Sequence, residues 1–131
     1  MTYFNSEYLQ VSGDDTIGCS VVEWKRFATS EEFRNGMNQT MGLMKEKGYT
    51  KILSNSSNLG PIAPEDQKWV IEEWLPQALA LGYNKIALIV PKDVFSQLAV
   101  DDIMEEANEV SPVDDKYFDN VDEAASWLAK S

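Results

Sequence analysis

The residues best suited to chemistry lie in one polar segment that begins at Ser54. The run Lys51–Asn55 is typical of a strand and Pro64 of a helix start, so this segment opens a loop between the two. Rigid strands position such loops, and the following helix end offers free N–H groups. We therefore treat five consecutive residues as a candidate binding or interaction loop: Ser54, Asn55, Ser56, Ser57 and Asn58.

Catalysis is not what the sequence favours. Glu65 and Asp66 could act as acid and base beside Ser56, but carboxylates in a first helical turn ordinarily complement the helix dipole. The chain has no histidine, which removes the commonest general base and the commonest transition-metal ligand. Cys19 is the single cysteine, so it can form neither an intrachain disulfide nor a thiolate cluster. We expect no catalytic residue, no metal site and no cofactor.

The charge of the chain argues against two classes of binding partner. The net charge is −11, and the stretch from Asp101 to Glu123 contains ten acidic residues against one basic residue, Lys116. Such a field repels phosphate backbones and anionic lipid, so we expect neither nucleic-acid nor membrane binding. The first residues show no basic region followed by an apolar stretch. We expect a cytoplasmic protein, either a monomer or a homodimer, with a protein partner or a small apolar ligand.

Large aromatic side chains suggest where such a ligand would bind. Four tryptophans in 131 residues are many, and apolar cavities with a few polar groups are the usual ligand sites. A pocket between a sheet and helices would be lined by Trp24, Trp69, Trp74 and Phe95. The other interpretation is that these side chains only fill the core.

Hydrophobic patterning predicts one domain over residues 1–131. Strands are expected at residues 8–11, 17–24, 51–55, 85–90 and 116–118. Helices are expected to begin at the capping boxes Thr29–Glu32 and Asn120–Glu123, at Pro64 and at the cap Asp93. An opening β-hairpin followed by alternating helices and strands predicts an α/β fold, with a mixed five-stranded sheet packed by about four helices.

Three details follow from individual residues. The run Lys85–Val90 has no alternation, which predicts a strand covered on both faces at the centre of the sheet, whereas residues 116–118 read as an edge strand. Pro76 lies inside a helical pattern and should bend that helix, and a bend can open a cleft beneath it. We also expect a break near Val100–Asp101 in the next helix.

Three short motifs in this order resemble a known group of proteins. They are Pro64-Glu65-Asp66-Gln67-Lys68-Trp69 at a helix start, Gly82-Tyr83-Asn84-Lys85-Ile86-Ala87 at a strand start, and Tyr117-Phe118-Asp119 through Glu123-Ala124 to Trp127-Leu128 at the end. Together they are similar to small bacterial STAS-like proteins. These proteins have the SpoIIAA-like fold, which STAS domains share with Sec14-related lipid-binding domains. The resemblance covers nearly the whole chain.

The resemblance implies a non-catalytic regulatory or protein-interaction module. STAS domains are often anti-sigma-factor antagonists, switched by phosphorylation of a serine in an Asp-Ser-Ser/Thr-Gly segment at a helix N-terminus. Here Ser56 and Ser57 echo that segment, with Asn55 in place of the aspartate and Asn58 in place of the glycine. By register the family's serine would fall near Ala63 or Pro64, so the alternative is a turn whose Ser and Asn side chains bond their own backbone.

Overall fold

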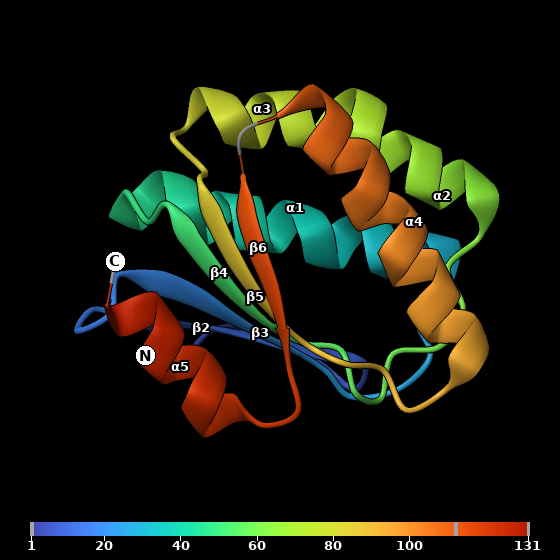
Figure 1. The fold of residues 1–131 in the computed structure, drawn as a ribbon, viewed down its shortest axis with the longest axis horizontal. Helices are drawn as coiled ribbons and strands as arrows, with labels where there is room; N and C mark the ends of the chain where they lie inside the picture. The colour runs from blue at the N-terminus through green and yellow to red at the C-terminus, as the bar shows by residue number, and fades with distance from the viewer. Residues whose placement is uncertain (1, 112, 131) are drawn as a thin grey trace.

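A single mixed sheet forms the middle of the molecule. The computed structural model describes residues 2–111 and 113–130. The strands are β1 (Thr2–Asn5), β2 (Leu9–Asp14), β3 (Cys19–Trp24), β4 (Lys51–Asn55), β5 (Lys85–Ile89) and β6 (Asp114–Phe118). They lie side by side in chain order (Figure 1). The expectation of five strands was wrong, because β1, a four-residue and mostly exposed strand, adds a sixth beside β2.

The sheet combines an antiparallel and a parallel part. β1, β2 and β3 pair antiparallel, which confirms the opening hairpin, and β3 to β6 pair parallel. Asp14 holds the β2–β3 turn, since its carboxylate accepts hydrogen bonds from the backbone N–H groups of Thr16 and Ile17. β6 is an edge strand, as expected. β5 is buried on both faces, but it lies next to that edge and not at the centre.

The helices begin where the sequence indicated. They are α1 (Ser30–Lys47), α2 (Pro64–Trp69), the π-helical segment η1 (Val70–Trp74), α3 (Leu75–Ala80), α4 (Val94–Val110) and α5 (Val121–Ala129). Thr29 and Glu32 form the expected capping box of α1, and Gly48 ends that helix in the left-handed conformation with φ 75°. α4 runs without a break, so the interruption near Val100–Asp101 is wrong.

In the helical rod formed by α2, η1 and α3, a π turn directly precedes Pro76. In η1 the N–H of Leu75 bonds to the carbonyl of Val70, five residues back. Pro76 has no N–H, and its ring would clash with the carbonyl of Glu72 in a regular helix. A π turn directly before the proline widens the helix at that point. The sequence predicted a bend at Pro76, and the structure shows a π turn directly ahead of the proline.

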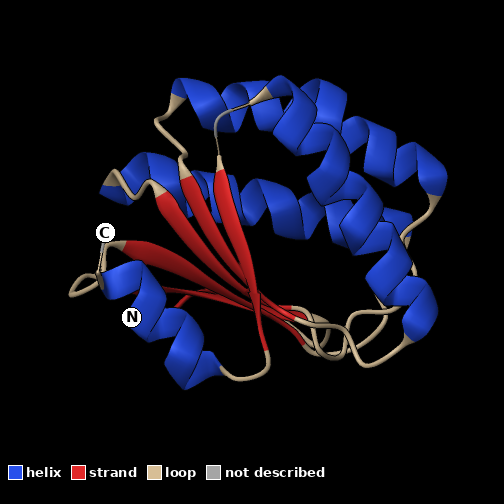
Figure 2. Ribbon diagram, in the orientation of Figure 1, coloured by secondary structure: helices blue, strands red, loops and turns tan. Residues whose placement is uncertain are grey.

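The sheet carries helices on both faces, but unequally. α1, the α2–η1–α3 rod and α4 lie on one face, and α5 lies alone on the other (Figure 2). Each face has its own apolar core, a large one beneath the three helical units and a small one beneath α5. Among the described residues no helix combines the length and apolar character needed to cross a bilayer.

Candidate functional site

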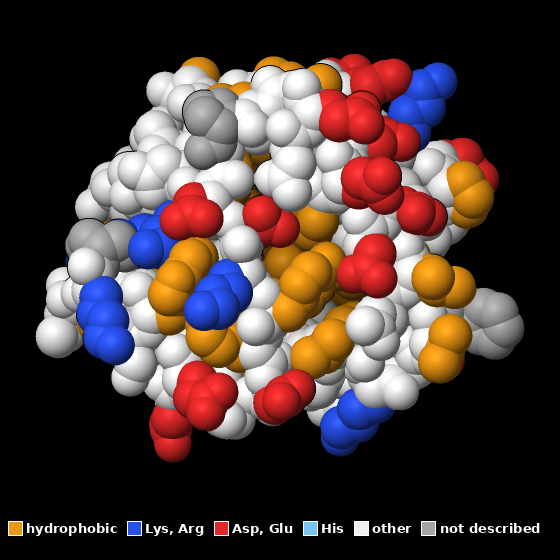
Figure 3. All heavy atoms as spheres, viewed as in Figure 1, with side chains coloured by type: hydrophobic (Ala, Val, Ile, Leu, Met, Phe, Trp, Pro, Cys, Tyr) orange, Lys and Arg blue, Asp and Glu red, His pale blue; other side chains and the backbone are white. Residues whose placement is uncertain are grey.

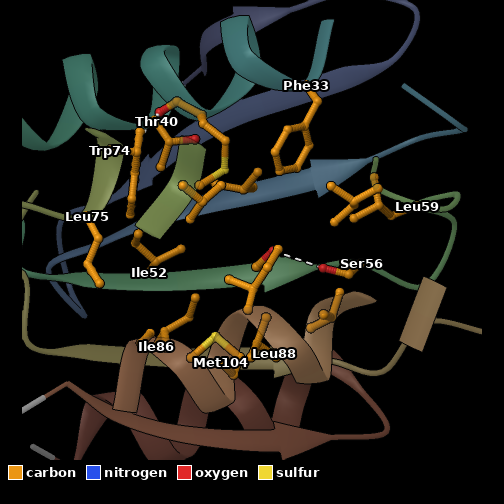
Figure 4. Close-up of a pocket in the computed structure, with 18 of the residues that line it drawn as sticks. Phe33, Thr40, Ile52, Ser56, Leu59, Trp74, Leu75, Ile86, Leu88 and Met104 are labelled. Atoms are coloured by element: carbon orange, nitrogen blue, oxygen red, sulfur yellow. Dashed lines mark hydrogen bonds between the residues drawn. The ribbon is translucent and has the colours of Figure 1, made fainter. Parts of the chain in front are cut away.

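An apolar cavity lies between the sheet and the larger helical layer. Its volume is about 100 Å³. The floor is formed by β3, β4 and β5, and the walls and roof by α1, η1, α4 and the loop before α2 (Figure 4). The lining includes Phe33, Ile52, Leu59, Trp74, Leu88 and Met104. The cavity thus occupies the place where the sequence predicted a pocket between sheet and helices.

Two serines place hydroxyl groups in this apolar wall. Ser54 lies in β4 between Val22 of β3 and Leu88 of β5, and Ser56 follows directly after the strand. Both line the cavity, both are buried, and their Oγ atoms are 3.1 Å apart (Figure 4). Strand alternation explains the inward direction of Ser54, because Ile52 and Ser54 share one face of β4. The polar part of the site is therefore the end of a strand.

The cavity roof is held by polar contacts between helices. Asp66 of α2 is buried and accepts hydrogen bonds from Ser30 Oγ (2.6 Å) and Arg34 Nε (2.7 Å), both on α1. Trp74 of η1 donates its indole N–H to the backbone carbonyl of Met37 on α1, at 2.8 Å. These bonds fix η1 and α2 against α1, so two sides of the cavity are rigidly joined. Asp66 therefore links α2 to α1 through two hydrogen bonds.

A side chain of α4 separates the cavity from solvent. Ile103 lines the cavity and also a surface groove between α2 and α4. That groove is polar, with Gln67, Lys68, Glu72, Asp102 and Glu106 along it. Ile103 is only half-buried. Ile103 is therefore the side chain that the cavity and this groove share.

The structure divides the aromatic residues that the sequence proposed for the pocket. Trp24 and Trp74 line the cavity, and Trp74 meets the ring of Tyr83 edge-on with centroids 5.8 Å apart. Trp69 lies outside, half-buried on the surface, where the Arg34 guanidinium is 5.2 Å from its ring centroid. The side chain of Phe95 falls outside the described part of the structure.

The structure also divides the predicted loop. Ser54 and Ser56 face the cavity, whereas Asn55 turns away and its side-chain oxygen accepts hydrogen bonds from the N–H and the hydroxyl of Ser57. Asn58 is exposed and its oxygen accepts a hydrogen bond from Lys92. Ser56 is 2% exposed, which leaves its hydroxyl out of reach of a kinase in this conformation. Asn55 and Ser57 form the self-bonded turn that the sequence gave as the alternative.

Several lining residues had no individual signal in the sequence. Phe33 and Met37 lie on the inner stripe of α1, Tyr83 precedes β5, and Met104 and Ala107 belong to α4. Helical spacing identifies them as inward-facing but does not distinguish a cavity wall from filled core. Pro76 was the one useful signal, because the π turn before it brings Val70, Ile71 and Trp74 to the cavity.

The single cysteine lies away from the cavity. Cys19 is buried on the α5 face, and burial, reinforced by nearby Asp14, raises the pKa of its thiol to about 12. A neutral buried thiol is a poor nucleophile. Within residues 2–111 and 113–130 no three Cys, His, Asp or Glu side chains come together as a metal would require.

Comparison with known proteins adds no relative. No protein-family model, no curated protein and no solved structure matches this chain. The function must therefore be argued from the cavity itself.

Proposed function

We propose that this protein is a non-catalytic binding module that holds a small, predominantly apolar molecule in the cavity between β3–β5 and the helices. The observation that carries the proposal is an interior space of about 100 Å³ with an almost wholly apolar wall. A packed protein interior leaves few voids larger than a water molecule. A space of this size is therefore a feature to be explained.

The size and chemistry of the cavity define what fits. An engineered apolar cavity of about 150 Å³ in another protein stays dry and binds benzene or xenon. The cavity here is of the same order and could hold a single ring or a short branched chain. A longer chain, such as a lipid acyl group, would have to extend past Ile103 into the groove between α2 and α4. Bound molecules of ring size are the simplest occupants.

A regulatory role for this module is proposed from the fold alone. The hairpin, the parallel strands in consecutive order and the helices between them support a STAS-like or SpoIIAA-like module. Fold analogy is an associational argument and does not choose a function. In such a module the ligand would act by stabilising one position of α4 against the sheet.

The test uses benzene as the probe. Benzene should bind the wild-type protein, with chemical-shift changes in amide NMR spectra confined to residues around the cavity and a change in the fluorescence of Trp24 or Trp74. Ala107 lines the cavity, so Ala107→Leu should fill part of it and abolish binding. Ala80, at the end of α3, does not line the cavity, and Ala80→Leu is the matched control. Binding that survives Ala107→Leu, or no binding by the wild type, would remove the proposal.

A second candidate rests on exposed apolar side chains. Val94 and Leu98 of α4 and Tyr117 of β6 are exposed, at 67%, 55% and 37%. Figure 3 shows apolar side chains at the surface between α4 and β6, with acidic side chains around them. Apolar patches rimmed by charge are typical of protein–protein contacts. Sedimentation of the wild type and of Leu98→Ser would show whether a second copy of the chain covers this surface.

A further inference from the structure

The wall of the cavity carries no charge. None of the described residues that line it is Asp, Glu, Lys or Arg. An ionised carboxylate or ammonium group placed there would lose its hydration without gaining a partner of opposite charge, which is strongly unfavourable. The cavity therefore selects against fatty-acid anions and amines bound with the charged end inward.

The wall is nevertheless not purely hydrocarbon. Ser54 and Ser56 are 8% and 2% exposed, and their hydroxyl oxygens are hydrogen-bonded to each other at 3.1 Å. Two hydroxyl groups have two hydrogens between them, and one bond uses one of these. No described residue accepts the second hydrogen. One donor, together with free lone pairs on both oxygens, is therefore left within an apolar enclosure.

Two other polar side chains of the wall already have an acceptor for their hydrogen. Thr40 donates its hydroxyl hydrogen to the carbonyl of Gly36 at 2.9 Å, and Trp74 donates its indole N–H to Met37. Tyr83 brings a hydroxyl on a ring that packs against Trp74. The serine pair lies at the floor, where Ser54 is flanked by Val22 and Leu88 and Ser56 follows the strand, and both residues line the cavity.

We propose that the natural ligand is an uncharged molecule of about one ring in size with one hydrogen-bonding oxygen, an alcohol, phenol or ketone, and that the Ser54–Ser56 pair binds this oxygen. The inference rests on the proposed function, because it names the class of molecule that the same cavity holds. The pair donates its unused hydrogen to the ligand oxygen, and a ligand hydroxyl donates back to a serine lone pair. The hydrocarbon part of the ligand lies against Trp74, Ile86 and Met104.

Matched probes separate the oxygen from the ring. Cyclohexanol and methylcyclohexane have the same number of heavy atoms, and cyclohexanecarboxylate adds a charge. The wild type should bind methylcyclohexane and cyclohexanol but not cyclohexanecarboxylate, measured by titration followed in amide NMR spectra. Ser56→Ala should weaken cyclohexanol binding about threefold to tenfold, the range of one net hydrogen bond. It should leave methylcyclohexane binding unchanged or improved.

Controls locate the effect. Ser57 is next in the chain, but its hydroxyl donates to Asn55 outside the cavity, so Ser57→Ala should change neither affinity. If cyclohexanol binding falls in Tyr83→Phe and not in Ser54→Ala or Ser56→Ala, the anchor is Tyr83 and the inference is overturned. Equal losses for both probes in Ser56→Ala would also overturn it. Failure of all three probes to bind the wild type would instead remove the proposed function.

Discussion

The two faces of the sheet are packed by different means. On the α5 face, Ala87 of β5 and Ala124 and Leu128 of α5 have no exposed surface. Alanine at facing positions lets a helix approach a sheet closely. On the opposite face three helical units of larger side chains share the sheet, and α4 packs against α2 and η1 across the cavity. One helix covers the α5 face, whereas three helical units share the opposite face and border the cavity.

The difference shows that a void is a property of arrangement and not of composition. Both cores are apolar, and both contain aliphatic and aromatic side chains. The cavity lies where the π turn of η1, the side of α4 and the floor of β4 and β5 meet. No single residue there is unusual. Substitutions that are equivalent in type should therefore have unequal effects on the two faces.

The largest expected difference is between two leucines. Leu128→Ala on the α5 face should lower the free energy of unfolding by about 3–5 kcal/mol, because it opens a new cavity in a filled core. Leu88→Ala should cost only about 2–3 kcal/mol, since Leu88 already borders a void and has fewer contacts to lose. Urea unfolding of both variants measures this. Equal costs would mean that the cavity is closed in solution.

Replacing an alanine by leucine should change the stability in opposite directions on the two faces. Ala124→Leu adds three carbons to the filled α5 face and should destabilise the protein by about 1–3 kcal/mol. Ala107→Leu adds the same atoms beside the cavity and should stabilise it by about 0.5–2 kcal/mol. Thermal unfolding of the two variants against wild type provides the measurement. A loss of stability in Ala107→Leu would show that the space near α4 cannot accept a side chain.

Exchange rates should distinguish the route into the cavity from its wall. Ile103→Val shortens the side chain shared by cavity and groove, so benzene should exchange about threefold to fourfold faster, as the packing of one methylene is lost. Ile71 also lines the cavity but not that groove, and Ile71→Val should leave the rate near that of wild type. NMR exchange spectroscopy compares the two. Faster exchange in Ile71→Val alone would place the route at η1.

A last difference concerns Cys19 on the α5 face. Burial raises the pKa of this thiol from its ordinary 9.0 to about 12, so the folded protein holds a proton that the unfolded chain releases. Stability should therefore fall as pH rises above 9, and Cys19→Ala should reduce that slope. At pH 8 the native thiol should not react with a disulfide reagent until the protein is unfolded. Rapid reaction of the native protein would show that α5 opens readily.

The fold was largely predictable because its signals are local. The capping box at Thr29, the helix start at Pro64 and the cap at Asp93 lie where the sequence indicated them. β1 was missed because a short, exposed strand has little alternation, and its pairing with β2 is decided by the sheet. The position of β5 beside an edge was missed because burial on both faces looks the same at the centre and next to the edge.

The candidate site was predictable only in part. Trp24 and Trp74 were identified because large aromatics on inward faces are limited in number, but Trp69, with the same composition signal, packs half-buried outside the cavity. Ser54 and Ser56 were singled out as surface loop residues, and the structure turns them inward. One residue of shift along a strand moves a side chain from one face to the other, so direction depends on the register with β3 and β5.

The sequence by itself determined the α/β class, the opening hairpin, the helix starts and the absence of histidine. These properties depend on residue identity and short-range spacing, which can be read directly from a sequence. Only the tertiary structure decided that the helical layer borders a cavity, that two serines line it and that α5 covers the other face alone. Such features arise where segments far apart in the chain meet, and their volume depends on the angles at which helices cross the sheet.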